Sequence, residues 1–202
     1  MTISVVVATY GGPEWVTMAE ERAIPSTLGQ GAHEVVAVHE NDGTIATCRN
    51  RGAAEATGEW LLFLDADDEL AADYVAAMRR AAGRHSTPEV LLTPAVQQIR
   101  KGRPGRPFFF PECSLTTGNW LIIGTLIRRE FFHQIGGFRD HPHGLEDWNL
   151  WARAVRMGAS IVKVRDAVYR AHWNSRSKHH VLARDRPRYM AAYEAARVDA
   201  WG

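Results

Sequence analysis

Three apolar runs rich in β-branched residues lie in the first third of the chain, at Ile3–Thr9, Glu34–Glu40 and Glu59–Asp65. Each run is continuous rather than alternating, which is typical of strands buried on both faces. Helix-compatible segments separate them. One begins at Pro13 and should bend or break near Pro25, and the other runs from Ile45 and stops at Gly58. This alternation predicts a mostly parallel, Rossmann-like sheet flanked by helices.

The order of elements after residue 65 is less regular. The pattern predicts a helix at Leu70–Ala82, a strand at Glu89–Ile99 and a loop at Arg100–Pro107. A strand and a short helix that ends at Gly136 and Gly137 come next, followed by a helix from Glu146 to about Met157. Two short strands at Ser160–Val164 and Ala167–His172 and a last helix at Arg186–Ala200 complete the chain. The sequence therefore belongs to the α/β class, with a mixed and aromatic-rich second half.

Composition and charge narrow the possible classes of protein. A chain of 202 residues with 46% hydrophobic and 23% charged content suits one globular domain. Lys plus Arg (24) and Asp plus Glu (23) nearly cancel, so no overall field favours nucleic acid or an anionic membrane. Cys48 and Cys113 show no zinc-like or disulfide-rich spacing. With no signal-peptide or membrane-span pattern, we expect a cytoplasmic protein.

Three aspartates, Asp65, Asp67 and Asp68, directly follow the third apolar run. Asp68 or Asp67 could cap the helix expected next, and we expect this role for Asp68. Asp65 and Asp67 lie two residues apart, so in an extended chain their side chains point the same way and could share a cation such as Mg²⁺ or Mn²⁺. An aspartyl nucleophile is a third reading, but the Thr or Val expected shortly after the second acid is missing.

The chain lacks the glycine-rich loops that bind phosphates directly. The first strand is followed only by "TYGGPE", with neither GxGxxG nor GxxxxGK[ST]. A nucleotide bound at the carboxyl ends of these strands would therefore need a metal ion to hold its diphosphate.

Three motifs in order, "SVVVATYGGPE", "CRNRGAAEATGEWLLFLDADD" and "IGGFRDHPHGLEDWNLWARAVRMG", give the chain a family resemblance. The sequence resembles the family-two glycosyltransferases, which have the GT-A fold and invert the anomeric centre. The match covers nearly the whole chain. It implies a single GT-A domain over residues 1–202, with a nucleotide-sugar-binding half at 1–99 and an acceptor-binding and catalytic half at 100–202.

The resemblance implies a set of residues that bind the nucleotide sugar. Thr9 and Tyr10 follow the first strand, where the family lines the base, and Arg49 matches a nucleotide-contacting arginine. An acidic residue after the second strand normally contacts the base as well. Here "HENDGT" replaces the usual turn, so Glu40 and Asp42 compete for this role, and Glu40 is favoured because it lies nearer the strand end.

The resemblance also implies a site for Mn²⁺ or Mg²⁺. Asp65 is similar to the family's acid that contacts the ribose or the metal, and Asp67 is similar to the direct metal ligand. Ala66, between them, is expected to contact the nucleotide sugar. His172 resembles the late histidine that completes the metal or diphosphate site, although a structural histidine is an equal reading of this position.

Asp147 of "LEDW", with Glu146 beside it, is similar to the catalytic base of the family. Capping of the helix that these acids open is the alternative. A helix N-terminus would stabilise the carboxylate and lower its proton affinity, which would keep Asp147 ionised at neutral pH. A base is needed because the acceptor hydroxyl must lose its proton as it attacks the anomeric carbon.

Several other features fit a plain structural role better than a functional one. Trp120, Trp148 and Trp151 could stack on sugars but are more typical of core. His141 and His143 are expected in an ordinary loop. Residues 100–110, "RKGRPGRPFFF", could receive an anionic or lipid-linked acceptor, but a surface loop before an edge strand is favoured. Residues 174–186 could form a loop over the diphosphate or a solvated linker.

The sequence as a whole predicts a metal-dependent inverting glycosyltransferase. Its donor would be a nucleoside diphosphate sugar, and its acceptor a hydroxyl on a glycan, a lipid-linked molecule or a small molecule. No nucleic-acid partner is expected, although a glycosylated nucleobase stays open as an acceptor, and a homodimer is possible. The alternative is a non-catalytic nucleotide- or sugar-binding module on the same fold.

Overall fold

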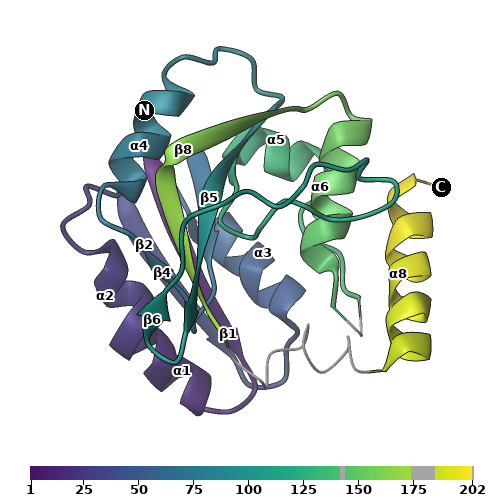
Figure 1. Ribbon diagram of the computed structural model, residues 1–202, viewed down its shortest axis with the longest axis horizontal. Coiled ribbons are helices and arrows are strands. Elements are labelled where there is room, and N and C mark those ends of the chain that lie inside the picture. The colour runs from purple at the N-terminus through teal and green to yellow at the C-terminus, as the bar shows by residue number, and fades with distance from the viewer. Residues whose placement is uncertain (142–143, 174–184, 202) are drawn as a thin grey trace.

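One sheet runs through the molecule with the strand order β2-β1-β3-β7-β5-β8-β4, and β6 pairs with β5 outside this path (Figure 1). The computed structural model describes residues 1–141, 144–173 and 185–201. The strands are β1 (Ile3–Tyr10), β2 (Glu34–Glu40), β3 (Trp60–Leu64), β4 (Glu69–Leu70), β5 (Val90–Arg100), β6 (Arg103–Pro104), β7 (Leu126–Arg128) and β8 (Ser160–His172).

Most of the long strands point the same way. β1 is parallel to β2 and β3, while β7 is antiparallel to both β3 and β5, so β5 runs in the direction of β3. β8 is parallel to β5. The carboxyl ends of β1, β2, β3, β5 and β8 therefore meet at one edge of the sheet, as expected for a Rossmann-like arrangement.

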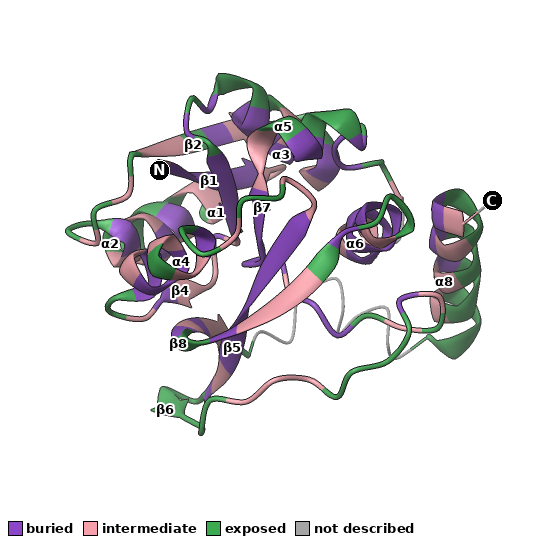
Figure 2. Ribbon diagram, turned by 90° about the horizontal axis from the view of Figure 1, so that it is seen from above, coloured by how far each residue is buried: buried purple, intermediate pink, exposed green. Residues whose placement is uncertain are grey.

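Helices cover both faces of this sheet (Figures 1 and 2). Their bounds are α1 (Glu14–Met18), the π-helix η1 (Ala19–Ala23), α2 (Ile24–Thr27), α3 (Ile45–Glu55), α4 (Tyr74–Ala82), α5 (Arg129–Gln134), α6 (Glu146–Arg156) and α8 (Arg186–Trp201). Helices α1, α2 and α4 lie on one side, and α3, α5 and α6 on the other (Figures 1 and 2). The apolar core lies between these layers, which explains why all five residues of β3 are buried.

The structure corrects four details of the predicted elements. The helix expected from Leu70 begins at Tyr74, because Leu70 pairs with Tyr169 of β8 as part of β4. Helix α3 ends at Glu55, since Ala56 already has extended backbone. Gly58 is instead a point of close approach, where an added Cβ would lie 2.5 Å from Ser4 Oγ.

The other two corrections concern strands. Residues 100–107, expected to be a loop, include β6 and form a hairpin with β5. The two short strands expected between residues 160 and 172 are one strand, β8, whose pairing with β5 shifts register at Pro94/Ala95. None of the described helices is long and apolar enough to cross a membrane.

Candidate functional site

A cavity of about 410 Å³ opens at the edge of the sheet where the parallel strands end. It brings together eight of the predicted site residues: Thr9, Tyr10, Arg49, Asp65, Ala66, Asp67, Glu146 and Asp147. The sheet explains this convergence, because β1 and β3 are adjacent and parallel and so deliver Thr9 and Asp65 to the same edge.

The side of the cavity next to β1 contains two residues that the sequence reading missed, Trp15 and Ile45. Trp15 lies in α1, directly after the β1 turn, a position that could have signalled a base-stacking role. Thr9 is fixed here because its Oγ1 lies 3.0 Å from Nδ1 of His39 on β2.

Glu40, the favoured acid after β2, does not line the cavity. Its Oε2 accepts a hydrogen bond of 3.1 Å from Thr47 at the start of α3. Asp42 does not line the cavity either. The choice between these two acids as the base contact stays a prediction.

The acids after β3 lie in a tight turn, closed by a 3.1 Å bond from Asp68 N–H to the Asp65 carbonyl. Asp68 does not cap α4, which starts at Tyr74. Instead, Asp68 Oδ1 accepts a 2.8 Å bond from the backbone N–H of His172, so the predicted cap ties the turn to β8. Burial, together with the charges of Asp67 and Asp65, raises the pKa of Asp68 well above its ordinary value.

Tyr169 of β8 also holds the acidic turn, a role that was not predicted from the sequence. Its hydroxyl accepts a 3.3 Å bond from the backbone N–H of Asp65 and bonds to the Asp68 carboxyl. Tyr169 is only 2% exposed, so its position is set by the core.

His172 lies at the end of β8 and does not line the cavity. Its Nε2 is 3.1 Å from Oε2 of Glu69, a pairing that the sequence reading did not anticipate. Among the residues that the structure describes, no group of three or more histidine, cysteine or acidic side chains forms a cluster able to hold a metal.

Arg49 connects the acidic turn to the acids on α6. Its guanidinium donates to Asp65 Oδ1 at 2.6 Å and to Glu146 Oε1 at 2.8 Å, and it lies 5.2 Å from the centre of the Phe138 ring. Arg49 is 5% exposed. Burial alone would lower its pKa, but the charges of Asp65 and Glu146 outweigh burial and raise it. This buried ion-pair bridge was not predicted.

Asp147 faces the cavity from the first turn of α6. Its Oδ1 accepts a 2.7 Å bond from Trp148 N–H, and its Oδ2 accepts a 3.2 Å bond from Asn119. Burial and the neighbouring charge of Glu146 raise its pKa to about 7. The expectation of a lowered proton affinity is therefore wrong, because burial and the charge of Glu146 outweigh the charge of Arg49 and the bond from Trp148 N–H.

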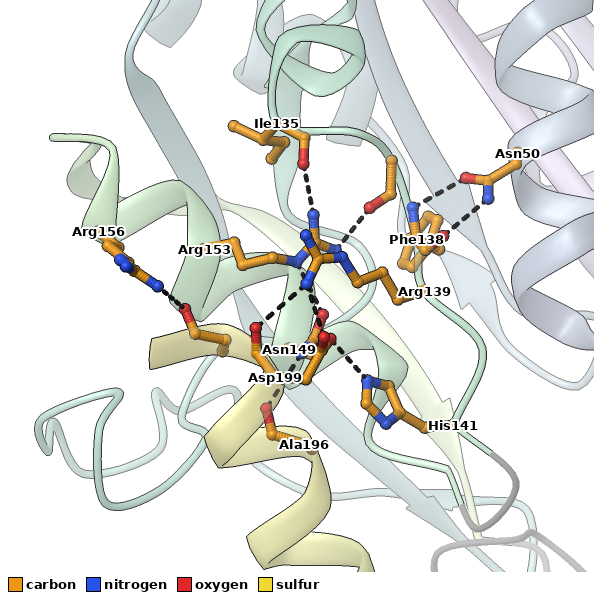
Figure 3. Close-up of polar contacts among 12 residues, drawn as sticks. Asn50, Ile135, Phe138, Arg139, His141, Asn149, Arg153, Arg156, Ala196 and Asp199 are labelled. Atoms are coloured by element: carbon orange, nitrogen blue, oxygen red, sulfur yellow. Dashed lines mark hydrogen bonds and ion pairs between the residues drawn. The ribbon is translucent and has the colours of Figure 1, made fainter. Parts of the chain in front are cut away.

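A polar network fixes the segment that leads into α6 (Figure 3). Arg153 of α6 donates to the carbonyls of Ile135 and Gly137 at 2.6 Å each and to Asn149 Oδ1 at 2.8 Å. Asn149 in turn donates to Asp199 of α8 at 2.9 Å.

The same network also connects α8 to the loop before α6. Asp199 pairs with Arg139 at 2.7 Å and with His141 at 3.5 Å, which agrees with the loop reading of His141 (Figure 3). His143 and residues 174–184 lie outside the described residues. The network thus joins α6, at Asn149 and Arg153, to α8 and to the loop that precedes α6.

Another part of the cavity wall is mostly apolar. It includes Val96, Phe110 and the run Leu121–Ile123, together with Gln98. Trp120, Trp148 and Trp151 do not line the cavity and are 8%, 2% and 0% exposed, so they belong to the core.

Comparison with known proteins decides the family. The sequence model of glycosyl transferase family 2 matches residues 20–140, which is more than half of the chain. The chain belongs to glycosyl transferase family 2. The matched segment includes Arg49 and the acidic turn, while Asp147 lies just beyond it.

Two curated relatives of this family 2 chain are biosynthesis proteins by their names. A PGL/p-HBAD biosynthesis glycosyltransferase of Mycobacterium bovis is 28% identical, over 81% of this chain and 62% of that protein. The O-antigen biosynthesis protein RfbC of Myxococcus xanthus is 25% identical, over 85% of this chain and 14% of that protein. The chain thus spans less than two thirds of either relative.

Solved structures place this family 2 chain in the GT-A fold. TarS residues 1–349 from S. aureus, in complex with UDP, superposes with a TM-score of 0.70 at 18% identity, over 98% of this chain and 65% of that chain. GalNAc-T7 with UDP, GalNAc and Mn²⁺ gives a TM-score of 0.65 at 16% identity, over 86% of this chain and 43% of that chain. The mostly parallel α/β sheet predicted from the sequence is therefore confirmed as GT-A.

Proposed function

We propose that this protein is a metal-dependent inverting glycosyltransferase that uses a nucleoside diphosphate sugar. The observation that carries the proposal is the pairing, in one cavity, of an acidic turn with a separate acid, Asp147, on another element. Structures with similar folds contain UDP or UDP-GlcNAc, so uridine diphosphate sugars are the first donors to test.

The acidic turn fits a divalent cation of the Mg²⁺ or Mn²⁺ type. Such ions take one or two protein carboxylates and complete their shell with substrate phosphates, so a three-ligand cluster is not required. Asp65, Asp67 and Asp68 all line the cavity. Because Arg49 already binds Asp65 Oδ1, we assign the direct metal contact to Asp67 and the ribose side to Asp65. A bound cation would neutralise the charge of the leaving diphosphate.

Asp147 is assigned as the base that takes the proton of the acceptor hydroxyl. Its raised pKa, about 7, makes it a stronger base than an ordinary aspartate while leaving a large ionised fraction at neutral pH. Asn119 and Trp148 N–H orient its carboxylate. Glu146 is bound by Arg49 and so does not serve as a second, nucleophilic carboxylate. The assignment of one base and no nucleophile supports a single displacement, which inverts the anomeric centre.

Hydrolysis of UDP-sugars with Mn²⁺, and transfer once an acceptor is found, tests these roles. Asp67→Asn and Asp147→Asn should each lower turnover by about 10²-fold or more. Asp73→Asn is the matched control, because Asp73 is exposed with left-handed backbone that asparagine tolerates.

Two results would contradict the proposal. Full turnover in both variants would show that the roles are misassigned. Metal-dependent binding of a nucleotide sugar by the unmodified protein, with no hydrolysis or transfer, would favour the non-catalytic binding module instead.

A further inference from the structure

A basic hairpin extends from the edge of the sheet that carries the cavity. It comprises Arg100, the turn Lys101–Gly102, β6 (Arg103–Pro104) and the following residues to Arg106. Lys101 and Gly102 have φ values of 50° and 73°, and Arg100 pairs with Arg103, so this is a two-residue hairpin turn. The segment therefore has a defined backbone conformation, whereas the sequence predicted an irregular loop.

Hydrogen bonds fix this hairpin against the sheet. Gly105 N–H donates to the Gln98 carbonyl at 2.9 Å, and the Gln97 side-chain amide donates to the Gly105 carbonyl at 2.9 Å. The oxygen of the same amide accepts a 3.2 Å bond from Arg170 on β8. The cations of the hairpin are thus displayed on an ordered support, which reduces the entropy lost when they bind a ligand.

The charge of the basic hairpin is not balanced by nearby acids. Arg100, Lys101, Arg103 and Arg106 are all exposed, and among the described residues none of them forms an ion pair with a carboxylate. The sequence has no Asp or Glu between Glu89 and Glu112. In a chain of net charge +1, this is a local concentration of positive charge.

The basic hairpin is continuous with the cavity wall. Val96 and Gln98 of β5 line the cavity, and the same strand enters the hairpin at Arg100. Two residues of extended strand cover about 7 Å, so a ligand held by the hairpin would reach the cavity directly. Arginine side chains suit repeated phosphate or carboxylate groups because their planar fork binds both oxygens.

We propose that the basic hairpin binds an anionic glycan, bearing phosphate or carboxylate groups, whose hydroxyl enters the cavity as the acceptor. This inference rests on the proposed glycosyltransferase function and names its acceptor class. A soluble polymer is favoured over a membrane surface because, among the described residues, none of residues 100–106 has a large apolar side chain that could enter a bilayer. Trp173, which is 51% exposed and donates its backbone N–H to the Ile99 carbonyl at 2.9 Å, lies at the base of the hairpin rather than on it.

Binding of labelled polygalacturonate and inorganic polyphosphate, with neutral dextran as the reference, tests the inference. The variant Arg103→Gln/Arg106→Gln should bind both polyanions about tenfold more weakly than the unmodified protein at low salt, and the affinity of the unmodified protein should fall as salt is raised. Arg80→Gln/Arg84→Gln is the matched control, since it removes the same charge from exposed positions at the end of α4 and should bind normally.

Three outcomes overturn the inference. One is equal binding of the polyanions by both double variants, another is no binding above the dextran level, and the third is hairpin-dependent binding only to phosphatidylglycerol vesicles. Nucleotide binding, measured as the thermal shift caused by UDP and Mn²⁺, should be the same in both double variants. If polyanion binding does not depend on the hairpin while UDP binding is intact, the hairpin proposal alone is overturned. If hairpin-dependent polyanion binding is present but UDP-sugars are not turned over, the proposed function is overturned instead.

Discussion

Arg49 is a single buried cation that holds two carboxylates from distant parts of the chain, Asp65 and Glu146. Removing one partner from a buried, hydrogen-bonded pair commonly costs about 3–5 kcal/mol, because a charge is left uncompensated. Its position beside Phe138 restricts the guanidinium further. We therefore assign Arg49 to positioning of the two acidic groups, in addition to any contact with the nucleotide.

The pH dependence of turnover should report on Asp147. This residue must be ionised to accept a proton, so turnover should rise with pH through about 7. The charge of Glu146 contributes to its raised pKa. Glu146→Gln removes that charge, so the acidic limb of kcat/KM should move to lower pH, by about one unit or less.

Profiles from pH 5 to 9 for the unmodified protein and Glu146→Gln measure this shift. Glu55→Gln is the control, since Glu55 forms an exposed ion pair with Arg51 and should leave the limb in place. An acidic limb that stays fixed in Glu146→Gln, or moves to higher pH, would remove Asp147 from the role of base.

At the residue scale, sequence patterns singled out most of the acids that face the cavity, although Glu40 does not line it, and they did not predict what holds these acids. Asp65 and Asp147 follow recognisable motifs, whereas the contact of Arg49 with Glu146 joins residues 97 positions apart. The pKa of Asp147 depends on burial, which the local sequence near a helix N-terminus does not reveal. Tyr169 went unnoticed because an aromatic residue in a strand is typical of ordinary core.

At the scale of elements, β8 controls the geometry of the acidic turn through Tyr169. Tyr169→Phe keeps the ring and removes the hydroxyl that bonds to Asp65 N–H and Asp68. Because the turn would then be held less firmly, we expect the Mn²⁺ concentration for half-maximal turnover to rise several-fold, with turnover at saturating Mn²⁺ little changed. The free energy of unfolding should fall by about 1 kcal/mol.

Tyr74→Phe separates a positioning role from a general loss of stability. The Tyr74 hydroxyl is equally buried, and its bond of 2.6 Å goes to the Gly124 carbonyl rather than to a residue of the acidic turn. Metal titrations of the two variants should differ, with Tyr74→Phe resembling the unmodified protein. Identical titrations for both variants would show that Tyr169 has only a structural role.

The elements that sequence predicted best are those whose signal is local. The continuous apolar runs gave β1, β2 and β3, and Gly136, with φ of 83°, follows the end of α5 as expected. Errors occurred where pairing with a distant strand decided the structure. Leu70 joins β4 because β8 lies beside it, although the sequence from Leu70 onward is helix-compatible.

At the scale of the whole molecule, Glu34 links three parts of the sheet. Its carboxylate accepts bonds from Ser4 Oγ on β1 at 2.6 Å and from Thr57 N–H before β3 at 2.6 Å. These bonds lower its pKa to about 2. The stabilisation is thus fully present above the ordinary value of 4.5 and is lost as the pH falls toward 2.

Glu34→Gln should lower the free energy of unfolding by about 1–2 kcal/mol at pH 7, a figure reduced for solvent screening of a half-exposed group. The difference from the unmodified protein should shrink below about pH 4. Urea unfolding at pH 7 and pH 3 measures both, with Glu20→Gln as an exposed control. A deficit of equal size at the two pH values would contradict the assignment.

The place of β7 in the sheet has a consequence for how such a protein can diversify. This short strand belongs to the second half of the chain, yet it lies between β3 and β5, which both come from the first half. Cutting or exchanging the chain at residue 99 would leave unpaired strand edges on each fragment. The two halves therefore cannot be shuffled as independent modules, and new acceptors must be acquired by altering surface segments while the interleaved sheet is kept.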